Sequence, residues 1–195
     1  MVTILFKEDI SKQKEFIEKS ILEGGIIIYP TDTIYGIGGR ADSESVVKRI
    51  YELKQKDRNL PLNVIVPDFN FISTYFEVSD EEQKLLHSKL PGPNTILLTS
   101  KDSCPISKSL YKKEEKKGIR ICDHYIQDIV FSLKVPLISA SCNISNQKPP
   151  AIFEDIPDSL LKQVDLVIID DSEVRGKGSE IFEVELMSKL VRKIR

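Results

Sequence analysis

The chain has 195 residues, of which 41% are hydrophobic and 30% are charged, and its formal net charge is −2. This length and composition predict one globular domain over residues 1–195 and exclude an intrinsically disordered chain. The three cysteines are far apart and show no metal-ligand spacing, so a structural zinc site is not expected. No apolar run approaches the roughly 18 residues of a membrane span, and no signal peptide is recognisable. We therefore expect a cytoplasmic protein with reduced thiols.

The first predicted elements lead to a polar segment that follows a buried strand. Residues 2–6 predict a short edge strand, and the apolar spacing in residues 11–23 predicts an amphipathic helix. Residues 26–29 form an apolar β-branched run that predicts a core strand, and Pro-Thr-Asp-Thr at residues 30–33 ends it. Ligands of open α/β sheets bind at the carboxyl ends of strands, so these hydroxyls and the carboxylate indicate a site. The alternative is that they only cap the next turn.

A basic segment follows the next predicted helix, which covers residues 43–53 with Ser43 as its N-cap. Lys54, Lys56 and Arg58 occupy alternate positions. In an extended chain these three side chains point the same way, so they form a candidate phosphate clamp. The alternative is a solvated helix C-terminus, whose dipole favours cations.

The middle of the chain predicts further strands and a helix around a sharp turn. Residues 62–66 and 96–98 predict strands, and residues 81–90 predict a helix that Pro-Gly-Pro at residues 91–93 follows. His87 lies within that helix without a second His or Cys at ligand spacing. We therefore expect His87 on the surface or in packing rather than on a metal.

Two more polar groups accompany predicted strands in the second half of the chain. Arg120 interrupts the apolar run of residues 118–122, and a buried guanidinium is costly unless it is paired or faces a polar site. Residues 126–133 predict a helix, and residues 135–139 predict a strand. That strand ends in the hydroxyls and amide of residues 139–145, as the first core strand ends in polar groups.

The C-terminal part completes the pattern of an α/β protein. Residues 165–170 predict the last clear core strand, residues 175–181 a flexible basic loop, and residues 190–192 a short strand. The loop glycines do not form the strand–GxxxxGK[ST]–helix pattern, so a Walker-type site is not indicated. Strands that alternate with helices, some of them short, predict an α/β fold with a mixed sheet.

Taken in order, these motifs resemble the YrdC-like family of L-threonylcarbamoyladenylate synthases. The matching segments cover nearly the whole chain: YPTDTIYGIG, a Lys-rich segment ending in PL, PGPNTILL, GIRICDH, PLISASCNIS, DLVIID and GSEI. The resemblance implies a strongly twisted mixed sheet with flanking helices and a large positive cavity. It also implies the synthesis of threonylcarbamoyl-AMP and pyrophosphate from L-threonine, bicarbonate and ATP, for t6A modification of tRNA. Mg²⁺ is expected on the triphosphate, held mainly by phosphates and water, and no residue is assigned to a metal.

The resemblance also implies roles for individual residues. Three positions match those that contact L-threonine: Thr33, Arg120, which holds the carboxylate, and Ser179. Four positions match the catalytic polar group around the nucleotide: Lys54, Lys56, Ser141 and Asn143. Contacts to ATP are implied for the following side chains: Lys56 or Arg58, Ser141, Asn143 and Arg192.

The chain departs from the family pattern at several positions. The usual arginine of the Lys-x-Arg pair is Lys56, and Arg58 lies two residues later, so either of them supplies the phosphate contact. Leu60 replaces a frequently polar position, and Ala140 replaces the common threonine of STSAN. The chain ends soon after Arg192, so we expect it to lack the additional C-terminal domain of the longer Sua-type relatives.

Two other function classes stay open. One is a YciO-like paralogue of unknown chemistry, although such proteins tend to lack the pair that Ser141 and Asn143 supply here. The other is a double-stranded RNA-binding module, which the basic residues between positions 101 and 120 favour. Candidate partners are the small substrates, RNA or tRNA, and the proteins that transfer the threonylcarbamoyl group, and no membrane is expected. No Ser-His-Asp or GxSxG pattern is present, so we expect catalysis by positioning and charge.

Overall fold

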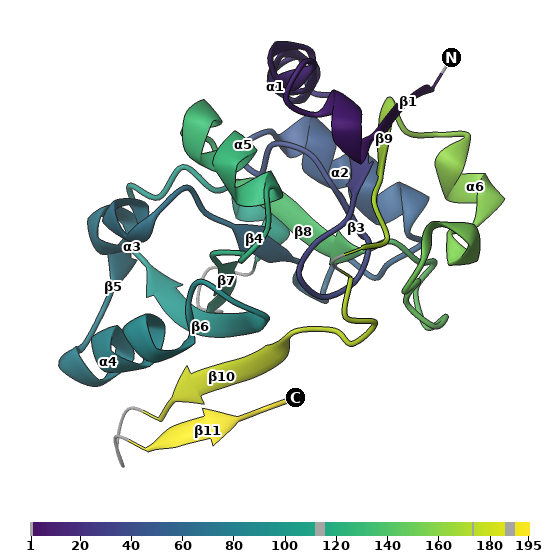
Figure 1. Ribbon diagram of the computed structural model, residues 1–195. Coiled ribbons are helices and arrows are strands. Elements are labelled where there is room, and N and C mark those ends of the chain that lie inside the picture. The colour runs from purple at the N-terminus through teal and green to yellow at the C-terminus, as the bar shows by residue number, and fades with distance from the viewer. Residues whose placement is uncertain (1, 112–115, 173, 186–189) are drawn as a thin grey trace.

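The computed structural model describes residues 2–111, 116–172, 174–185 and 190–195. In these residues the chain forms six α-helices, three short 3-10 helices and eleven strands (Figure 1). The helices are α1 (Lys14–Leu22), α2 (Glu44–Leu53), α3 (Phe69–Tyr75), α4 (Asp80–Lys89), α5 (Ile126–Leu133), α6 (Asp158–Leu161), η1 (Lys7–Asp9), η2 (Lys108–Leu110) and η3 (Phe153–Asp155). The strands are β1 (Thr3–Phe6), β2 (Ile27–Tyr29), β3 (Gly36–Gly38), β4 (Asn63–Ile65), β5 (Phe76–Glu77), β6 (Asn94–Ser100), β7 (Lys117–Arg120), β8 (Leu137–Ser141), β9 (Leu166–Ile169), β10 (Glu180–Val184) and β11 (Val191–Lys193).

The strands form a twisted mixed sheet with helices on its faces (Figure 1). The strand order is β1-β9-β2-β3-β8-β4-β7-β6-β10-β11, and β5 pairs with β6 beside this path. The pairs β1–β9, β2–β9, β4–β7 and β6–β10 are parallel, and the other pairs are antiparallel. This confirms the predicted α/β fold with a twisted mixed sheet, and it confirms β1 as an edge strand.

The core lies on both faces of the sheet, which explains the continuous apolar run at residues 26–29. Ile28 belongs to a buried cluster that includes Val47 and Ile50 of α2. Its neighbour Ile27 faces the opposite way, into a second cluster formed with side chains of α1 and α5. Successive strand residues point to opposite faces, so a strand covered on both faces shows no alternation of apolar and polar residues.

The face that carries α1 and α5 also carries the main pocket of interest. In the antiparallel pair of β4 and β8, Ile65 lies opposite Leu137 and Asn63 lies opposite Ser139. Cross-strand partners project from the same face of a sheet. Ile65 and Leu137 are buried in the cluster with α5, whereas Asn63 and Ser139 line a pocket. The same two strands therefore supply core side chains at one end and pocket side chains at the other.

Two segments differ from the sequence prediction. Of residues 175–181, predicted as a loop, residues 175–179 lie outside any helix or strand, but Glu180 and Ile181 belong to β10, which pairs in parallel with β6. Residues 54–58 are not extended, because Lys54 is the C-cap of α2 and Gln55 has a φ of 50°, so the chain turns there. Ser43 takes the predicted N-cap position of α2, but its side chain makes no capping hydrogen bond.

The described helices are too short to cross a membrane. The longest, α2 and α4, have 10 residues each, whereas a span takes about 20. The three cysteines are free thiols.

Candidate functional site

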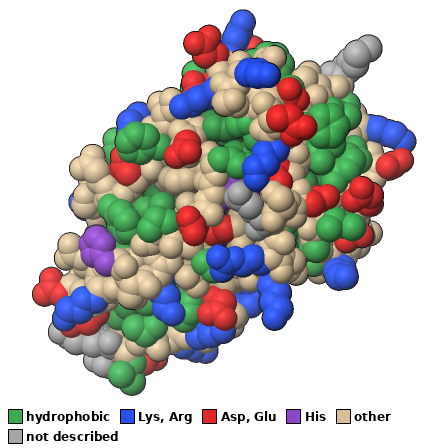
Figure 2. Space-filling view, in the orientation of Figure 1, with side chains coloured by type: hydrophobic (Ala, Val, Ile, Leu, Met, Phe, Trp, Pro, Cys, Tyr) green, Lys and Arg blue, Asp and Glu red, His purple; other side chains and the backbone are tan. Residues whose placement is uncertain are grey.

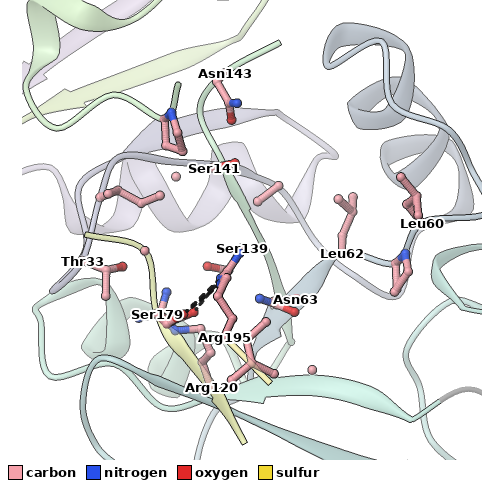
Figure 3. Close-up of a pocket in the computed structure, with 18 of the residues that line it drawn as sticks. Thr33, Leu60, Leu62, Asn63, Arg120, Ser139, Ser141, Asn143, Ser179 and Arg195 are labelled. Carbon is pink, nitrogen blue, oxygen red and sulfur yellow. Dashed lines mark hydrogen bonds between the residues drawn. The ribbon is translucent and has the colours of Figure 1, made fainter. Parts of the chain in front are cut away.

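A pocket of about 460 Å³ lies over the middle of the sheet (Figure 3), a volume typical of ligand sites. Among the described residues that line it there is no Asp or Glu, but there are five cations: Lys54, Lys56, Lys116, Arg120 and Arg195. Three other hollows, of about 580, 620 and 650 Å³, each include at least one carboxylate. The first pocket is therefore suited to an anionic ligand in a way that the larger hollows are not.

The segment after β2 forms a tight turn that contributes hydroxyl side chains to this pocket. Thr31 Oγ1 accepts hydrogen bonds from the backbone N–H groups of Thr33 and Ile34, and it donates to the Ile34 carbonyl at 2.7 Å. The two hydroxyls of Thr31 and Thr33 lie 2.8 Å apart. Either hydroxyl can donate in this pair, and both side chains line the pocket. The segment thus both caps a turn and lines the pocket.

Arg120 is a deeply buried cation of the pocket, 4% exposed. Its Nη2 lies 2.6 Å from Asp32 Oδ1, and the other Asp32 oxygen accepts from the Asp123 N–H at 3.2 Å. Burial opposes the charge, but the surrounding groups, Asp32 among them, leave the pKa of Arg120 raised. Arg120 Nε has no hydrogen-bond partner within the described part of the chain. The structure therefore turns Arg120 towards a polar site and not outward, with Asp32 as a partner that sequence reasoning missed.

Ser179 is brought to the same region by the segment before β10. Its Oγ lies 2.8 Å from Thr95 Oγ1, and Arg195 Nη2 lies 3.4 Å from the same oxygen. Arg195 also donates to the Ser179 carbonyl from Nε at 3.2 Å and from Nη2 at 3.1 Å (Figure 3). Burial, and then the charge of Arg120, lower the pKa of Arg195. Two cations that repel each other across a pocket favour an anion between them.

Lys54 is held by the loop that follows β8. Its ammonium donates to the backbone carbonyl of Ser141, to the carbonyl of Asn143 at 2.8 Å and to Asn143 Oδ1 at 3.4 Å. An ammonium has three donors, so all of them are used. Burial lowers the pKa of Lys54 to about 8, and the nearby Lys56 acts in the same direction. Lys54 therefore fixes this loop and does not present a free charge to the pocket.

Hydrogen bonds hold the loop after β8 at several positions. Asn143 Nδ2 donates to the carbonyls of Ile144 at 3.1 Å and Gln147 at 2.6 Å, and the Ser145 N–H donates to the Lys54 carbonyl at 2.8 Å. The Cys142 thiol is fully buried, and burial raises its pKa to about 12. A protonated, inaccessible thiol is not a nucleophile. Lys54, Ser141 and Asn143, which the resemblance placed in one polar group, thus do lie together, although 87 positions separate Lys54 from Ser141.

The resemblance implied ATP contacts for three further basic residues, of which one lines the pocket and two do not. Lys56 lines the pocket, its ammonium makes no hydrogen bond or ion pair with any described residue, and burial lowers its pKa. Arg58 is exposed and pairs with Glu52 at 3.4 Å, outside the pocket lining. Arg192 is exposed on β11 and does not line the pocket either. Neither Arg58 nor Arg192 therefore lines this pocket, and the ATP contacts that the resemblance implied for them stay predictions.

Arg195, and not Arg192, lies beside Ser179, and strand register is the reason. Arg192 stands opposite Glu183 in the β10–β11 pair, at the far end from Ser179. Beyond β11 the chain continues along β10, and the Ile181 N–H donates to the Arg195 carbonyl at 3.0 Å. Arg195 is therefore carried alongside Ser179 while Arg192 is not.

The donor set also decides how a metal would be held. Across the described ranges, no three His, Cys, Asp or Glu side chains are grouped to hold a metal ion. Hydroxyls, amides and cations suit the phosphates of a nucleotide, which would themselves carry Mg²⁺. His87 stacks on Phe69 with ring centroids 4.8 Å apart, so its role in packing is confirmed.

Family models and relatives point to one family. Residues 19–195 match the Sua5/YciO/YrdC family model, whose description is "Telomere recombination". Over 182 residues the chain is 38% identical to a protein of Methanocaldococcus jannaschii named "Putative threonylcarbamoyl-AMP synthase". That alignment covers 93% of this chain and 84% of the relative.

Solved structures share the fold. The crystal structure of P. abyssi Sua5 complexed with L-threonine matches the whole chain with a TM-score of 0.86 and 23% identity, and the chain spans 57% of that protein's length. The structure of E. coli YciO matches the whole chain with a TM-score of 0.81 and 21% identity, and 95% of YciO is covered. At these identities the likeness shows the fold alone. Because the family model matches residues 19–195, which is nearly the whole chain, the chain belongs to the Sua5/YciO/YrdC family.

Proposed function

We propose that this chain is an L-threonylcarbamoyladenylate synthase, which makes threonylcarbamoyl-AMP and pyrophosphate from L-threonine, bicarbonate and ATP. One observation carries the proposal: a single pocket is lined by five cations and by no carboxylate among the described residues. It contains the three side chains that the resemblance assigned to threonine, and it also contains Lys56, Ser141 and Asn143 of those assigned to the nucleotide. The M. jannaschii relative has the name of this activity, and the P. abyssi relative was solved with L-threonine. The product would serve t6A modification of tRNA in the cytoplasm, with the threonylcarbamoyl-transfer proteins as downstream partners.

The threonine half of the site is formed by a cation and by hydroxyl groups, which complement the carboxylate and the polar groups of an amino acid. Arg120 offers a buried guanidinium to the carboxylate of the amino acid, because only one of its edges is used by Asp32. Thr33 presents a hydroxyl at the pocket, which can hydrogen-bond the polar groups of threonine. Ser179, held by Thr95 and Arg195, completes the polar wall.

The nucleotide half relies on the free ammonium of Lys56. A cation without a partner in a partly buried position gains most from a phosphate ligand, because little of its charge is screened or already paired. Ser141 and Asn143 lie in the loop that Lys54 holds, so Lys54 acts here as a positioning residue. Mg²⁺ would be coordinated by phosphate oxygens of ATP and by water.

The reaction then needs orientation and charge more than a covalent nucleophile. The threonine nitrogen attacks the carbon of bicarbonate and water leaves, which gives a carbamate. A carbamate oxygen then attacks the α-phosphorus of ATP, the bond to the β-phosphate breaks, and pyrophosphate leaves with the electron pair. Negative charge grows on the phosphates during this step, and Lys56 with Arg195 would stabilise it.

The alternatives gain less support. The RNA-binding alternative rests on the basic residues between positions 101 and 120, of which those at 112–115 lie outside the described residues. Three of the described ones turn inward and do not form an RNA-binding face. Lys116 pairs with Glu183 at 2.9 Å, Lys117 lies over the Tyr111 ring at 5.0 Å, and Arg120 is buried. The YciO-like alternative is disfavoured by Ser141 and Asn143, which lie at the pocket.

Threonine-dependent release of pyrophosphate tests the proposal. The purified chain is given ATP, Mg²⁺ and bicarbonate, with L-threonine present or absent, and pyrophosphate is measured over time. We expect release only in the complete mixture, and removal of bicarbonate should abolish it as well. Equal release with and without L-threonine would refute the proposal.

A further inference from the structure

Asn63 is a polar side chain in the pocket that neither the motif resemblance nor the relatives assign to a function. It begins β4, inside a run of apolar residues, and it lies opposite Ser139 of β8. Both side chains line the pocket, and Asn63 is half-buried. Figure 3 shows its carboxamide beside Ser139, on the side of Arg120 and Arg195, with Leu60 further away.

A glycine in the neighbouring strand makes room for this carboxamide. A Cβ on Gly118 of β7 would lie 2.2 Å from Asn63 Oδ1 and 3.0 Å from its Cγ, distances that side chains do not tolerate. The same Cβ would lie 3.1 Å from Cγ2 of Thr95, whose hydroxyl contacts Ser179. The carboxamide therefore lies against Gly118 of β7, next to the group of side chains assigned above to threonine.

The carboxamide has no hydrogen-bond partner among the described residues, unlike the polar groups around it. Thr33, Ser179 and Arg120 each have a partner within the protein. A carboxamide carries two donors and two acceptor sites, and leaving these without partners in a partly buried position costs free energy. A role in packing alone is better served by an apolar side chain, as Val64 and Ile65 show in the same strand.

We propose that Asn63 is a further substrate-binding residue, whose carboxamide hydrogen-bonds the amino-acid substrate. This inference rests on the proposed function, because it takes the Thr33, Arg120 and Ser179 side of the pocket as the threonine side. A site that hydrogen-bonds a polar substrate group discriminates strongly against ligands that lack it, since its own amide is then left unpaired. Asn63 therefore contributes to affinity and to selection of the amino acid, and it does not contribute to ATP binding.

Asn63→Leu tests this inference, because leucine keeps the size of the side chain and removes its polar atoms. We expect the KM for L-threonine to rise about ten- to a hundredfold, with the KM for ATP changed by less than about twofold. Calorimetric titration of L-threonine without ATP should show the same loss of affinity. The matched control is Asn70→Leu, an exposed asparagine of α3 outside the pocket, which should leave both constants unchanged. An unchanged threonine affinity, or an equal rise of both KM values, would overturn the inference.

Gly118→Ala gives an independent test that leaves Asn63 in place. The new methyl group collides with the carboxamide, a movable side-chain end, so threonine affinity should fall in the wild-type background. In the Asn63→Ala background the same change should cost clearly less affinity, because only the 3.1 Å contact with Thr95 Cγ2 remains, and an equal loss in both backgrounds would contradict the inference. This cycle also decides the matter if Asn63→Leu does not fold. Absence of any threonine-dependent reaction in the wild-type protein would instead count against the proposed function, whereas threonine binding by calorimetry tests Asn63 by itself.

Discussion

Replacing Lys56 and Arg58 in turn by alanine separates the two candidate phosphate contacts. The Lys56 side chain lines the pocket and is half-buried, and its ammonium has no partner among the described residues. Under the proposed function we therefore expect Lys56→Ala to remove a charge-assisted hydrogen bond to the nucleotide. Such a bond contributes roughly 1.5–3 kcal/mol, which corresponds to about a ten- to hundredfold loss of kcat/KM for ATP. The Arg58 side chain is 57% exposed and is paired with Glu52, so Arg58→Ala should lower kcat/KM less than about threefold.

The assay is the initial rate of pyrophosphate release at varied ATP, with L-threonine and bicarbonate saturating. Arg58→Ala serves as the matched control, because it removes a cation of the same turn at a distance of two residues. A larger loss in Arg58→Ala than in Lys56→Ala would refute the reasoning and would mean that the turn rearranges when ATP binds. Small and equal losses in both variants would mean that this segment is only a solvated helix end.

Three further predictions concern the buried charges of the site. Asp32→Asn keeps the hydrogen bond from the Asp123 N–H but removes the charge paired with Arg120. The free energy of unfolding in denaturant titrations should therefore fall by up to about 3–5 kcal/mol. An unchanged midpoint would contradict this. Lys54→Met removes all three donors to the loop after β8, so amide hydrogen exchange over residues 141–145 should accelerate, while unchanged exchange would exclude a positioning role. The pKa of Lys54 is about 8, so the ammonium is present below this pH and is lost as the pH rises through it. ATP affinity measured by calorimetry should therefore weaken above about pH 8. The lowered pKa of Lys56 acts in the same direction, because that ammonium also loses its charge as the pH rises. The loss of affinity between neutral pH and high pH should be smaller in Lys54→Met.

Local patterns in the sequence determined the elements and the places where polar groups leave the core. Residues 126–133 were predicted as a helix and form α5 with the same bounds, because the apolar period and the boundaries are set within the segment itself. The apolar run at residues 26–29 was identified as a core strand, since only burial on both faces accounts for it. Polar residues after two such strands indicated a site, and Thr33 and Asn143, one from each of these segments, line the same pocket.

The tertiary structure alone decided which polar groups already have partners. Asp32 and Arg120 are 88 residues apart, so nothing local shows that they form a pair, and the register of β10 with β11 selects Arg195 over Arg192. The three donors of Lys54 are used because the loop after β8 closes over it, which turns a presumed phosphate contact into a support. Spacing in a sequence gives direction along one element, whereas distances between elements depend on strand pairing and packing across the whole sheet. That is why the residue types of the site were predictable and their division into binding and supporting groups was not.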